Sequence, residues 1–407
     1  LYKGGEKHVE MPSNIKLVSY GNEYSDLPDF LEDMVGLRIK ETMNKRPLIG
    51  VSPYKTVRCA TDVLQRYHYS LQQLPFCGRI EEMNQLRNFL DKDQKFLWWA
   101  ITGQAGAGKS RLALEFLKRS TGSWFGFFIN DKATQEDFDS FEPFNNTVIV
   151  IDYVAGREGF VANAIRSIKE KFENVDYKVR ILLLERENSR NASSWYYKLI
   201  QRIGKYDAYD LKSTEYENYF LNLGDLDKAS VEILIKEVMN QRGIEAADTV
   251  AYELCEAYGK KYEKLQFRPL FVQIFVEAWI ENDFQLPRYD KFEELLQRLL
   301  EREQERWLEI LDNDQVCCNA FIRLLLRANI SGKLQPDNMP SYYQDDWYIV
   351  NSFLQNHSFP GKQREEEKKA IFATICQNLD ENSVEIEPLY PDLIKEYMFY
   401  FYMDDSR

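Results

Sequence analysis

The pattern of hydrophobic and polar residues divides the chain into a part with buried strands and a largely helical part. Apolar runs or alternations short enough for single strands cover residues 96–101, 124–129, 147–151, 179–184 and 218–223. Apolar residues at helical spacing follow within residues 112–117 and 160–172. Strands that alternate with helices predict an α/β fold, a parallel sheet with helices on both faces.

From about residue 225 onward, most apolar positions recur at helical spacing. The helices predicted there cover residues 229–240, 292–309, 317–328 and 347–355, and Asp227 is a plausible cap for the first of them. Residues 384–387 alternate as a short strand would, and Pro391-Asp392 then predicts a helix start. Before the sheet, residues 27–44 and 53–73 also look helical, and residues 362–369 form a charged run.

A glycine-rich loop lies between the first predicted strand and the helix after it. Residues 103–110 read GQAGAGKS and fit the P-loop pattern, whose backbone N–H groups bind phosphates at a helix N-terminus. We expect Lys109 to reach the outer phosphates of ATP or ADP and Ser110 to bind Mg²⁺ through its hydroxyl. The other loop residues expected around the phosphates are Gly103, Ala105, Gly106, Ala107, Gly108 and Arg111. The alternative is a glycine turn that binds nothing.

Two charged residues follow buried strands of the predicted sheet. Asp152 ends the run at 147–151, and Arg186 follows the run at 179–184. The carboxyl ends of parallel strands meet at one edge of a sheet, so both residues are expected beside the P-loop. Asp152 would then act on the Mg²⁺ ion, and Arg186 could pair with a phosphate. The alternatives are an ordinary strand-end aspartate and a solvated loop arginine.

Length and charge limit the classes of protein that the chain could be. Its 407 residues are enough for two or three domains, and a net charge of -13 argues against a nucleic-acid coat. Six cysteines without a C-x-x-C pair and three histidines argue against a zinc site or a disulfide scaffold. Such sparse thiols suit a cytoplasmic protein, and no apolar run is long enough to span a membrane. The chain begins at Leu1 without a signal peptide, so we expect a piece of a longer protein.

Several motifs together resemble the STAND ATPases, signalling relatives of the AAA+ ATPases. Phe76-Cys77-Gly78-Arg79 is a hydrophobic pair followed by Gly-Arg-x-x-Glu, about twenty-five residues before the P-loop. Asp152-Tyr153, Arg186, the Phe267-Arg268-Pro269 stretch and Pro391-Asp392 also resemble motifs of this family. The resemblance covers residues 75–407 and extends to NACHT and NB-ARC receptors and to bacterial antiviral Avs proteins.

The resemblance implies a division of the chain and a role for each motif. Residues 1–75 would be a helical linker or the tail of an upstream domain, followed by a nucleotide domain (76–224), a helical lid (225–305) and a winged-helix-like domain (306–407). Gly78 and Arg79 would lie over the adenine and ribose, Pro269 would close over the adenine, and Arg186 would contact the γ-phosphate. Tyr153 stands where many AAA+ ATPases carry a second acid, which implies slow ATP hydrolysis by Lys109, Asp152 and Arg186.

The function implied is a nucleotide-gated switch. ADP would hold the domains closed, and exchange for ATP and Mg²⁺ would allow self-association and activate an attached effector in bacterial defence. The effector and the sensor repeats of the family would lie outside this chain, and no membrane or nucleic-acid partner is expected. Two alternatives remain open: an AAA+ ATPase that acts on DNA, of the origin-recognition type, and a pseudo-enzyme that uses nucleotide only as structural glue.

Overall fold

The computed structural model describes most of the chain from residue 67 onward. The described residues are 50, 67–130, 133–202, 212–217, 219–245, 247–262, 267–288, 291–331, 334, 340–356, 389 and 392–403. The chain divides into two compact units, Leu1–Pro47 and Leu48–Arg407, and all described residues belong to the second. The helix predicted over 27–44, the charged run at 362–369, the strand at 384–387 and Pro391 lie outside the described residues.

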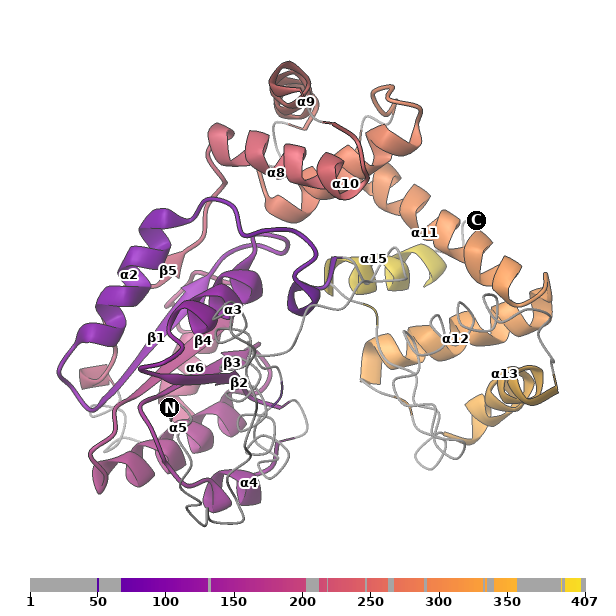
Figure 1. The fold of residues 1–407 in the computed structure, drawn as a ribbon. Coiled ribbons are helices and arrows are strands. Elements are labelled where there is room, and N and C mark those ends of the chain that lie inside the picture. Colours follow the sequence, from indigo (N-terminus) through magenta and orange to yellow (C-terminus); the bar gives the residue numbers. More distant parts are fainter. Residues whose placement is uncertain are drawn as a thin grey trace, which may run out of the picture. The chain divides into compact units, whose positions relative to one another are not determined.

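A parallel sheet forms the centre of the first half of the described chain (Figure 1). Its strands are β1 (Phe96–Thr102), β2 (Phe125–Phe128), β3 (Thr147–Asp152), β4 (Val179–Glu185) and β5 (Leu221–Asn222), in the order β2-β3-β4-β1-β5. Every pairing is parallel, and every residue of β1 and β4 is buried. Strands covered on both faces read as continuous apolar runs, which is why the sequence revealed them. The predicted α/β fold class is confirmed.

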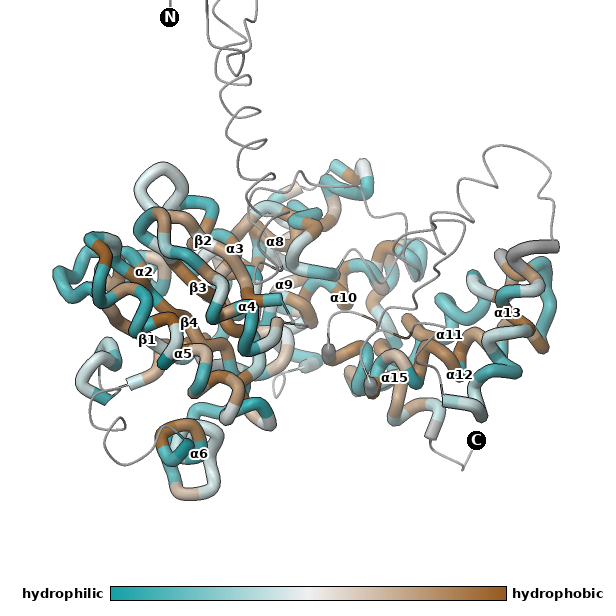
Figure 2. Tube along the Cα trace, turned by 90° about the horizontal axis from the view of Figure 1, so that it is seen from below, coloured by the Kyte–Doolittle hydropathy of each residue, from teal (hydrophilic) through white to brown (hydrophobic). Residues whose placement is uncertain are grey.

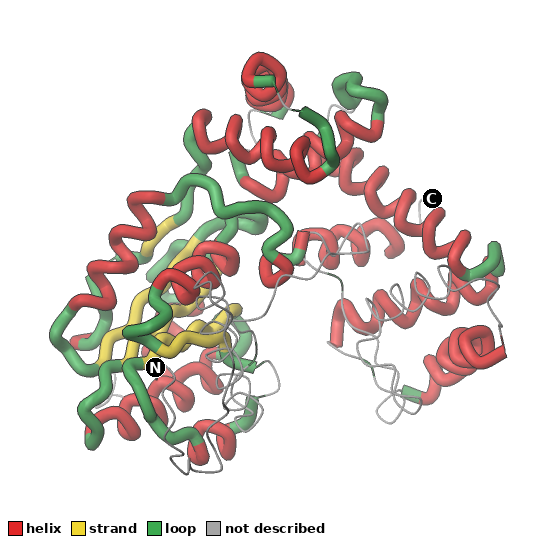
Figure 3. Tube along the Cα trace, viewed as in Figure 1, coloured by secondary structure: helices red, strands yellow, loops and turns green. Residues whose placement is uncertain are grey.

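Helices cover both faces of this sheet (Figure 3). They are α2 (Ile80–Asp91), α3 (Lys109–Arg119), α4 (Gln135–Ser140), α5 (Glu158–Glu173) and α6 (Trp195–Arg202). Buried residues of α2 and α3 share one apolar cluster with Leu97, Trp99 and Ile101 of β1. Trp98 points to the opposite face, where its ring lies 6.2 Å from that of Tyr196 in α6. Hydrophobic residues concentrate on the strands between these two layers (Figure 2).

A helical region follows the sheet, as the sequence predicted. Its helices are α8 (Lys228–Gln241), α9 (Asp248–Lys261), α10 (Pro269–Glu281), α11 (Phe292–Ile310), α12 (Gln315–Ser331), α13 (Gln344–Asn356) and α15 (Asp392–Met403), with a short 3-10 helix η6 (Ser341–Tyr343). Asp227 caps α8 as predicted, because its carboxylate accepts a hydrogen bond from Ser230 N–H at 2.9 Å. Pro269 occupies the first turn of α10, where its missing N–H costs no helical hydrogen bond.

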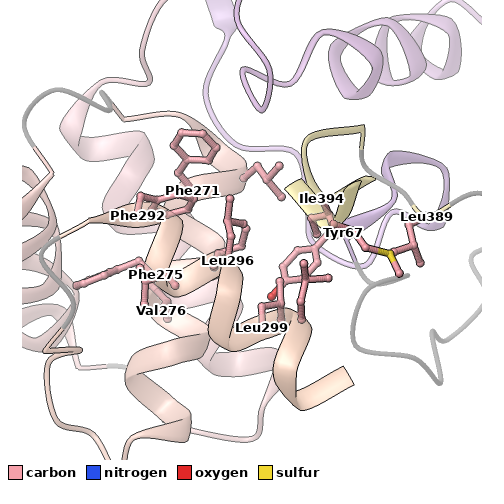
Figure 4. Close-up of a cluster of buried hydrophobic side chains, with 14 of the residues drawn as sticks. Tyr67, Phe271, Phe275, Val276, Phe292, Leu296, Leu299, Leu389 and Ile394 are labelled. Atoms are coloured by element: carbon pink, nitrogen blue, oxygen red, sulfur yellow. The ribbon is translucent and has the colours of Figure 1, made fainter. Parts of the chain in front are cut away.

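One apolar cluster runs through this region from α8 to α15. In Figure 4, Phe271 and Phe275 of α10 lie beside Phe292 and Leu296 of α11. The same view shows Tyr67 between Leu299 and Ile394, so the residues just before the sheet and α15 join the same core.

The end of the second predicted N-terminal helix differs from expectation. Within residues 67–73, the structure has a 3-10 helix η3 (Tyr69–Leu71) and not a continuing α-helix. The physical reason is local: His68 is extended, and its imidazole Nδ1 accepts a hydrogen bond from Ser70 N–H at 3.2 Å. Gln72 then adopts a left-handed conformation, which ends the turn.

Candidate functional site

The P-loop connects β1 to α3 and has the backbone that its glycines allow. Gly106 and Gly108 have φ values of 80° and 93°, in the left-handed region that favours glycine. Gly108 directly precedes the first residue of α3, so the loop delivers the chain to a helix N-terminus. A Cβ at Gly106 would also lie 3.2 Å from Cβ of Leu270 in α10. Backbone conformation and a close neighbour therefore both require glycine at position 106.

Lys109 and Ser110 begin α3 and face the end of β3. The Lys109 ammonium is mostly buried and donates hydrogen bonds to the carbonyl oxygens of Gly103 at 2.7 Å and Gln104 at 3.4 Å. The Ser110 hydroxyl donates to Asp152 Oδ2 at 2.6 Å. The sheet thus brings together a hydroxyl and a carboxylate that are 42 positions apart in the sequence.

Glu185, which sequence reasoning did not single out, is a buried carboxylate that holds the loop after β3. Its Oε2 accepts hydrogen bonds from the backbone N–H of Val154 at 3.1 Å and of Ala155 at 2.7 Å, and its Oε1 accepts from Arg186 N–H at 2.6 Å. A carboxylate with three N–H donors is well compensated for its burial. The only sequence feature that could have indicated this role is the position of Glu185 at the end of an apolar strand.

Tyr153 and Arg186 follow β3 and β4 at the same edge of the sheet. Tyr153 has a φ of 60°, which is uncommon for a residue other than glycine. The Arg186 guanidinium lies 5.7 Å from the centre of the Tyr153 ring and forms an ion pair with Glu396 of α15 at 2.7 Å. The C-terminal helix of the described chain therefore contacts the predicted phosphate-sensing arginine directly.

Arg79 ties the segment before α2 to the P-loop and to the start of the helical region. Its guanidinium is buried and donates to the carbonyl oxygens of Ala107 at 3.2 Å, Gly224 at 2.6 Å and Asp225 at 3.4 Å. It also forms an ion pair with Glu82 at 2.8 Å. Through these contacts Arg79 holds the P-loop against the segment that leads into the helical region.

The start of α10 packs on the P-loop. A Cβ at Gly108 would lie 3.8 Å from Cγ of Pro269, and the Leu270 N–H donates to the Gly106 carbonyl oxygen at 3.4 Å. The Arg268 guanidinium donates to the Ala105 carbonyl oxygen at 3.0 Å. Three consecutive residues of the helical region thus touch the loop.

A cavity of about 380 Å³ lies between these elements. Its lining includes the predicted residues Arg79, Ala105, Gly106, Ala107, Gly108, Lys109, Ser110, Arg111, Asp152, Arg186 and Pro269. Two predicted residues pack behind the lining: Gly78 lies against Ser230 of α8, and Gly103 lies against Leu223. The lining also includes Phe76, Cys77 and Tyr153, which belong to motifs that the sequence analysis named. The sequence did not indicate the further lining residues, which are Gly50, Tyr67, His68, Tyr69, Gln72, Gln73, Leu74, Pro75, Phe128, Ile129, Asn130, Leu226, Leu234, Leu270, Gln273 and Leu393.

The cavity has the groups that a nucleotide with a divalent ion requires. The loop offers a helix N-terminus and a lysine for phosphates, and Ser110 and Asp152 offer adjacent oxygen ligands of the kind Mg²⁺ prefers. Cys77 also lines it, but burial, with a smaller effect of Glu237, raises the pKa of this thiol to about 11. A protonated thiol is a poor nucleophile, so the cavity is suited to binding phosphates rather than to cysteine chemistry.

The core has the fold of P-loop NTPases. No protein-family model matches the sequence, and the search of curated proteins finds no similar one. Similar solved structures include the Walker-type ATPase PABY2304 of Pyrococcus abyssi, with a TM-score of 0.34 and 12% identity over 84% of this chain and 99% of that chain. The ORC1 protein of Aeropyrum pernix in complex with DNA has a TM-score of 0.35 and 11% identity over 80% of this chain and 93% of that chain.

A RuvB variant of Thermotoga maritima has a TM-score of 0.33 and 14% identity over 79% of this chain and 95% of that chain. These similarities are distant, and the fold assignment rests on the sheet order and the P-loop of this chain. Among the described residues, no helix is both long and apolar enough to cross a membrane. Within the same residues, no group of three or more His, Cys, Asp or Glu side chains could hold a metal ion.

Proposed function

We propose that this chain is the nucleotide-binding core of a STAND-type switch, which binds ADP in one arrangement and ATP with Mg²⁺ in another. Lys109 and the N–H groups of the P-loop would hold the phosphates, and Ser110 and Asp152 would hold the ion. Arg186 would respond to the γ-phosphate. The switch would control self-association and an attached effector, in keeping with a role in bacterial defence.

The ion pair between Arg186 and Glu396 carries this proposal. Arg186 lines the cavity that contains the P-loop, while Glu396 belongs to α15 near the end of the described chain. A γ-phosphate near Arg186 would compete with the Glu396 carboxylate for the same guanidinium. A ligand shifts an equilibrium only by its different affinities for the two states, and this competition would supply such a difference between ATP and ADP.

The composition of the cavity lining adds support. The proposed phosphate-binding residues lie in the loop after β1, at the end of β3, directly after β4 and in α3, whereas Pro269, Leu270 and Gln273 come from α10 and Leu393 from α15. A ligand in this cavity would touch the sheet domain and the helical region at once. Such a ligand stabilises the arrangement in which both parts contact it, which is the physical requirement for a nucleotide-gated switch.

The switch predicts that ATP and ADP act differently on α15. With ATP and Mg²⁺, amide hydrogen exchange in residues 392–403 should increase, because the γ-phosphate releases Glu396; with ADP it should not. Glu396→Gln should raise ATP affinity about two- to fivefold over ADP, in keeping with the small energy of a half-exposed ion pair. Glu309→Gln on α11 makes the same charge change outside the cavity lining and should alter neither quantity. Equal exchange in α15 with both nucleotides would refute the switch.

Hydrolysis by this chain alone should be slow. Asp152 is the only carboxylate among the described residues of the cavity lining, and Tyr153 stands beside it. Within the described lining, no second acid is then placed to orient the attacking water, so turnover should fall far below the enzyme median of about 10 per second. Asp152→Asn should weaken Mg²⁺-dependent ATP binding more than ADP binding. Phosphate release and calorimetric titration measure both effects, and rapid turnover without any partner would contradict the first.

A further inference from the structure

Gln273 is a buried polar side chain that faces the cavity without a partner. It is 9% exposed, lies in the otherwise apolar α10 and lines the cavity. Its carboxamide makes no hydrogen bond with any residue that the structure describes, although buried polar groups nearly always have one. Neither carboxamide atom is among the fully buried side-chain atoms that lack a partner, so the carboxamide is open to the cavity, where a ligand would complete its hydrogen bonds.

The position of Gln273 on α10 indicates which part of a nucleotide it would meet. Pro269 lies on the P-loop, and Gln273 follows it by four residues on the same face of the helix. Four residues correspond to a rise of about 6 Å along the axis, away from the phosphate end. Leu226 and Leu234 line the cavity from the neighbouring α8 side, and Phe76 and Cys77 also belong to the lining. Apolar lining residues beside a carboxamide suit a flat heteroaromatic ring with a polar edge.

We propose that Gln273 reads the edge of the nucleobase and selects adenine. The inference deepens the proposed function and rests on it. A carboxamide has one acceptor and one donor group, which match the exocyclic N6 amino group and a ring nitrogen of adenine. On the edge that carries N7, guanine instead presents two acceptors, O6 and N7, so the carboxamide oxygen would find no donor there. The only carboxylate in the described lining, Asp152, hydrogen-bonds Ser110 beside the P-loop, so it is not at this part of the cavity.

The test measures affinity for four probes by calorimetric titration: ATP, GTP, the triphosphate of purine riboside (ATP without its 6-amino group) and inorganic tripolyphosphate. The wild-type protein should prefer ATP to GTP and to the purine riboside analogue by about tenfold to a hundredfold, the range expected for a bidentate amide–base contact. Gln273→Leu should lose this preference and leave tripolyphosphate binding unchanged. Gln273→Glu, which can accept from N6 but cannot donate to N7, should weaken ATP binding. Gln285→Glu makes the same change at an exposed site outside the lining and should behave as wild type.

Two results would overturn the assignment: ATP binding by Gln273→Leu at wild-type affinity, or equal binding of ATP and the purine riboside analogue by the wild-type protein. The second comparison needs no variant, so it decides the question even if Gln273→Leu does not fold. Wild-type protein that binds neither ATP nor tripolyphosphate would instead refute the phosphate site, and therefore both proposals. Failure of the base contact alone leaves tripolyphosphate binding intact, so the two failures are distinguishable.

Discussion

Replacing Lys109 by alanine should lower ATP affinity about a hundredfold or more while the protein stays folded. Lys109 is the lysine of the P-loop, and its ammonium group lines the cavity close to the loop carbonyl oxygens of Gly103 and Gln104. A bound triphosphate would draw this cation into charge-assisted hydrogen bonds, each of which contributes about 1.5–3 kcal/mol. A loss of about 3 kcal/mol corresponds to roughly a hundredfold in affinity.

Calorimetric titration with ATP and Mg²⁺ measures the effect, and a thermal melt verifies folding. Lys118→Ala is the matched control, since Lys118 lies near the end of the same helix and its ammonium group contacts Gln72 Oε1 at 2.7 Å. That variant should bind ATP as the wild-type protein does. Undiminished ATP binding by Lys109→Ala would show that the loop is a glycine turn without a phosphate.

The sequence predicted the parts of the site that depend on local pattern. The P-loop is contiguous, and strands buried on both faces read as apolar runs, so the loop and the sheet followed from the sequence. Asp152 could be placed because parallel strands end at one edge, and its hydrogen bond with Ser110 agrees with that argument. The nucleotide roles of these residues stay predictions that the experiments above test.

The other parts of the site depend on contacts between distant segments. Arg186 and Glu396 are 210 positions apart, and nothing in the local sequence pattern indicates that they form an ion pair. Gln273 lies in an apolar helix, and only the fold shows that it faces a cavity. Arg79 illustrates a further limit: its motif could be recognised, but the carbonyl oxygens that it contacts belong to the P-loop and to residues 224–225.

Arg180 gives the largest stability effect that we expect in the sheet domain. It is fully buried in β4, and burial lowers the pKa of its guanidinium to about 10. The described contacts supply carbonyl oxygens around it rather than a carboxylate, at Phe89 (2.8 Å), Leu90 (3.2 Å), Lys92 (2.6 Å) and Gln94 (2.9 Å). The carbonyls of Phe89, Leu90 and Lys92 stand at the C-terminal end of α2, where the helix dipole favours a cation.

Arg180→Met keeps a long unbranched chain in the sheet but removes every one of these donors. Several carbonyl oxygens would stay buried without their partner, so the free energy of unfolding should fall by about 3 kcal/mol or more. Arg87→Met is the matched control, because Arg87 is exposed on α2 and its guanidinium, among the described residues, reaches only Asn84 Oδ1, at 3.4 Å. Urea unfolding followed by tryptophan fluorescence measures both variants. A midpoint for Arg180→Met equal to that of Arg87→Met would mean that water replaces the guanidinium at no cost, and that Arg180 does not anchor α2 to the sheet.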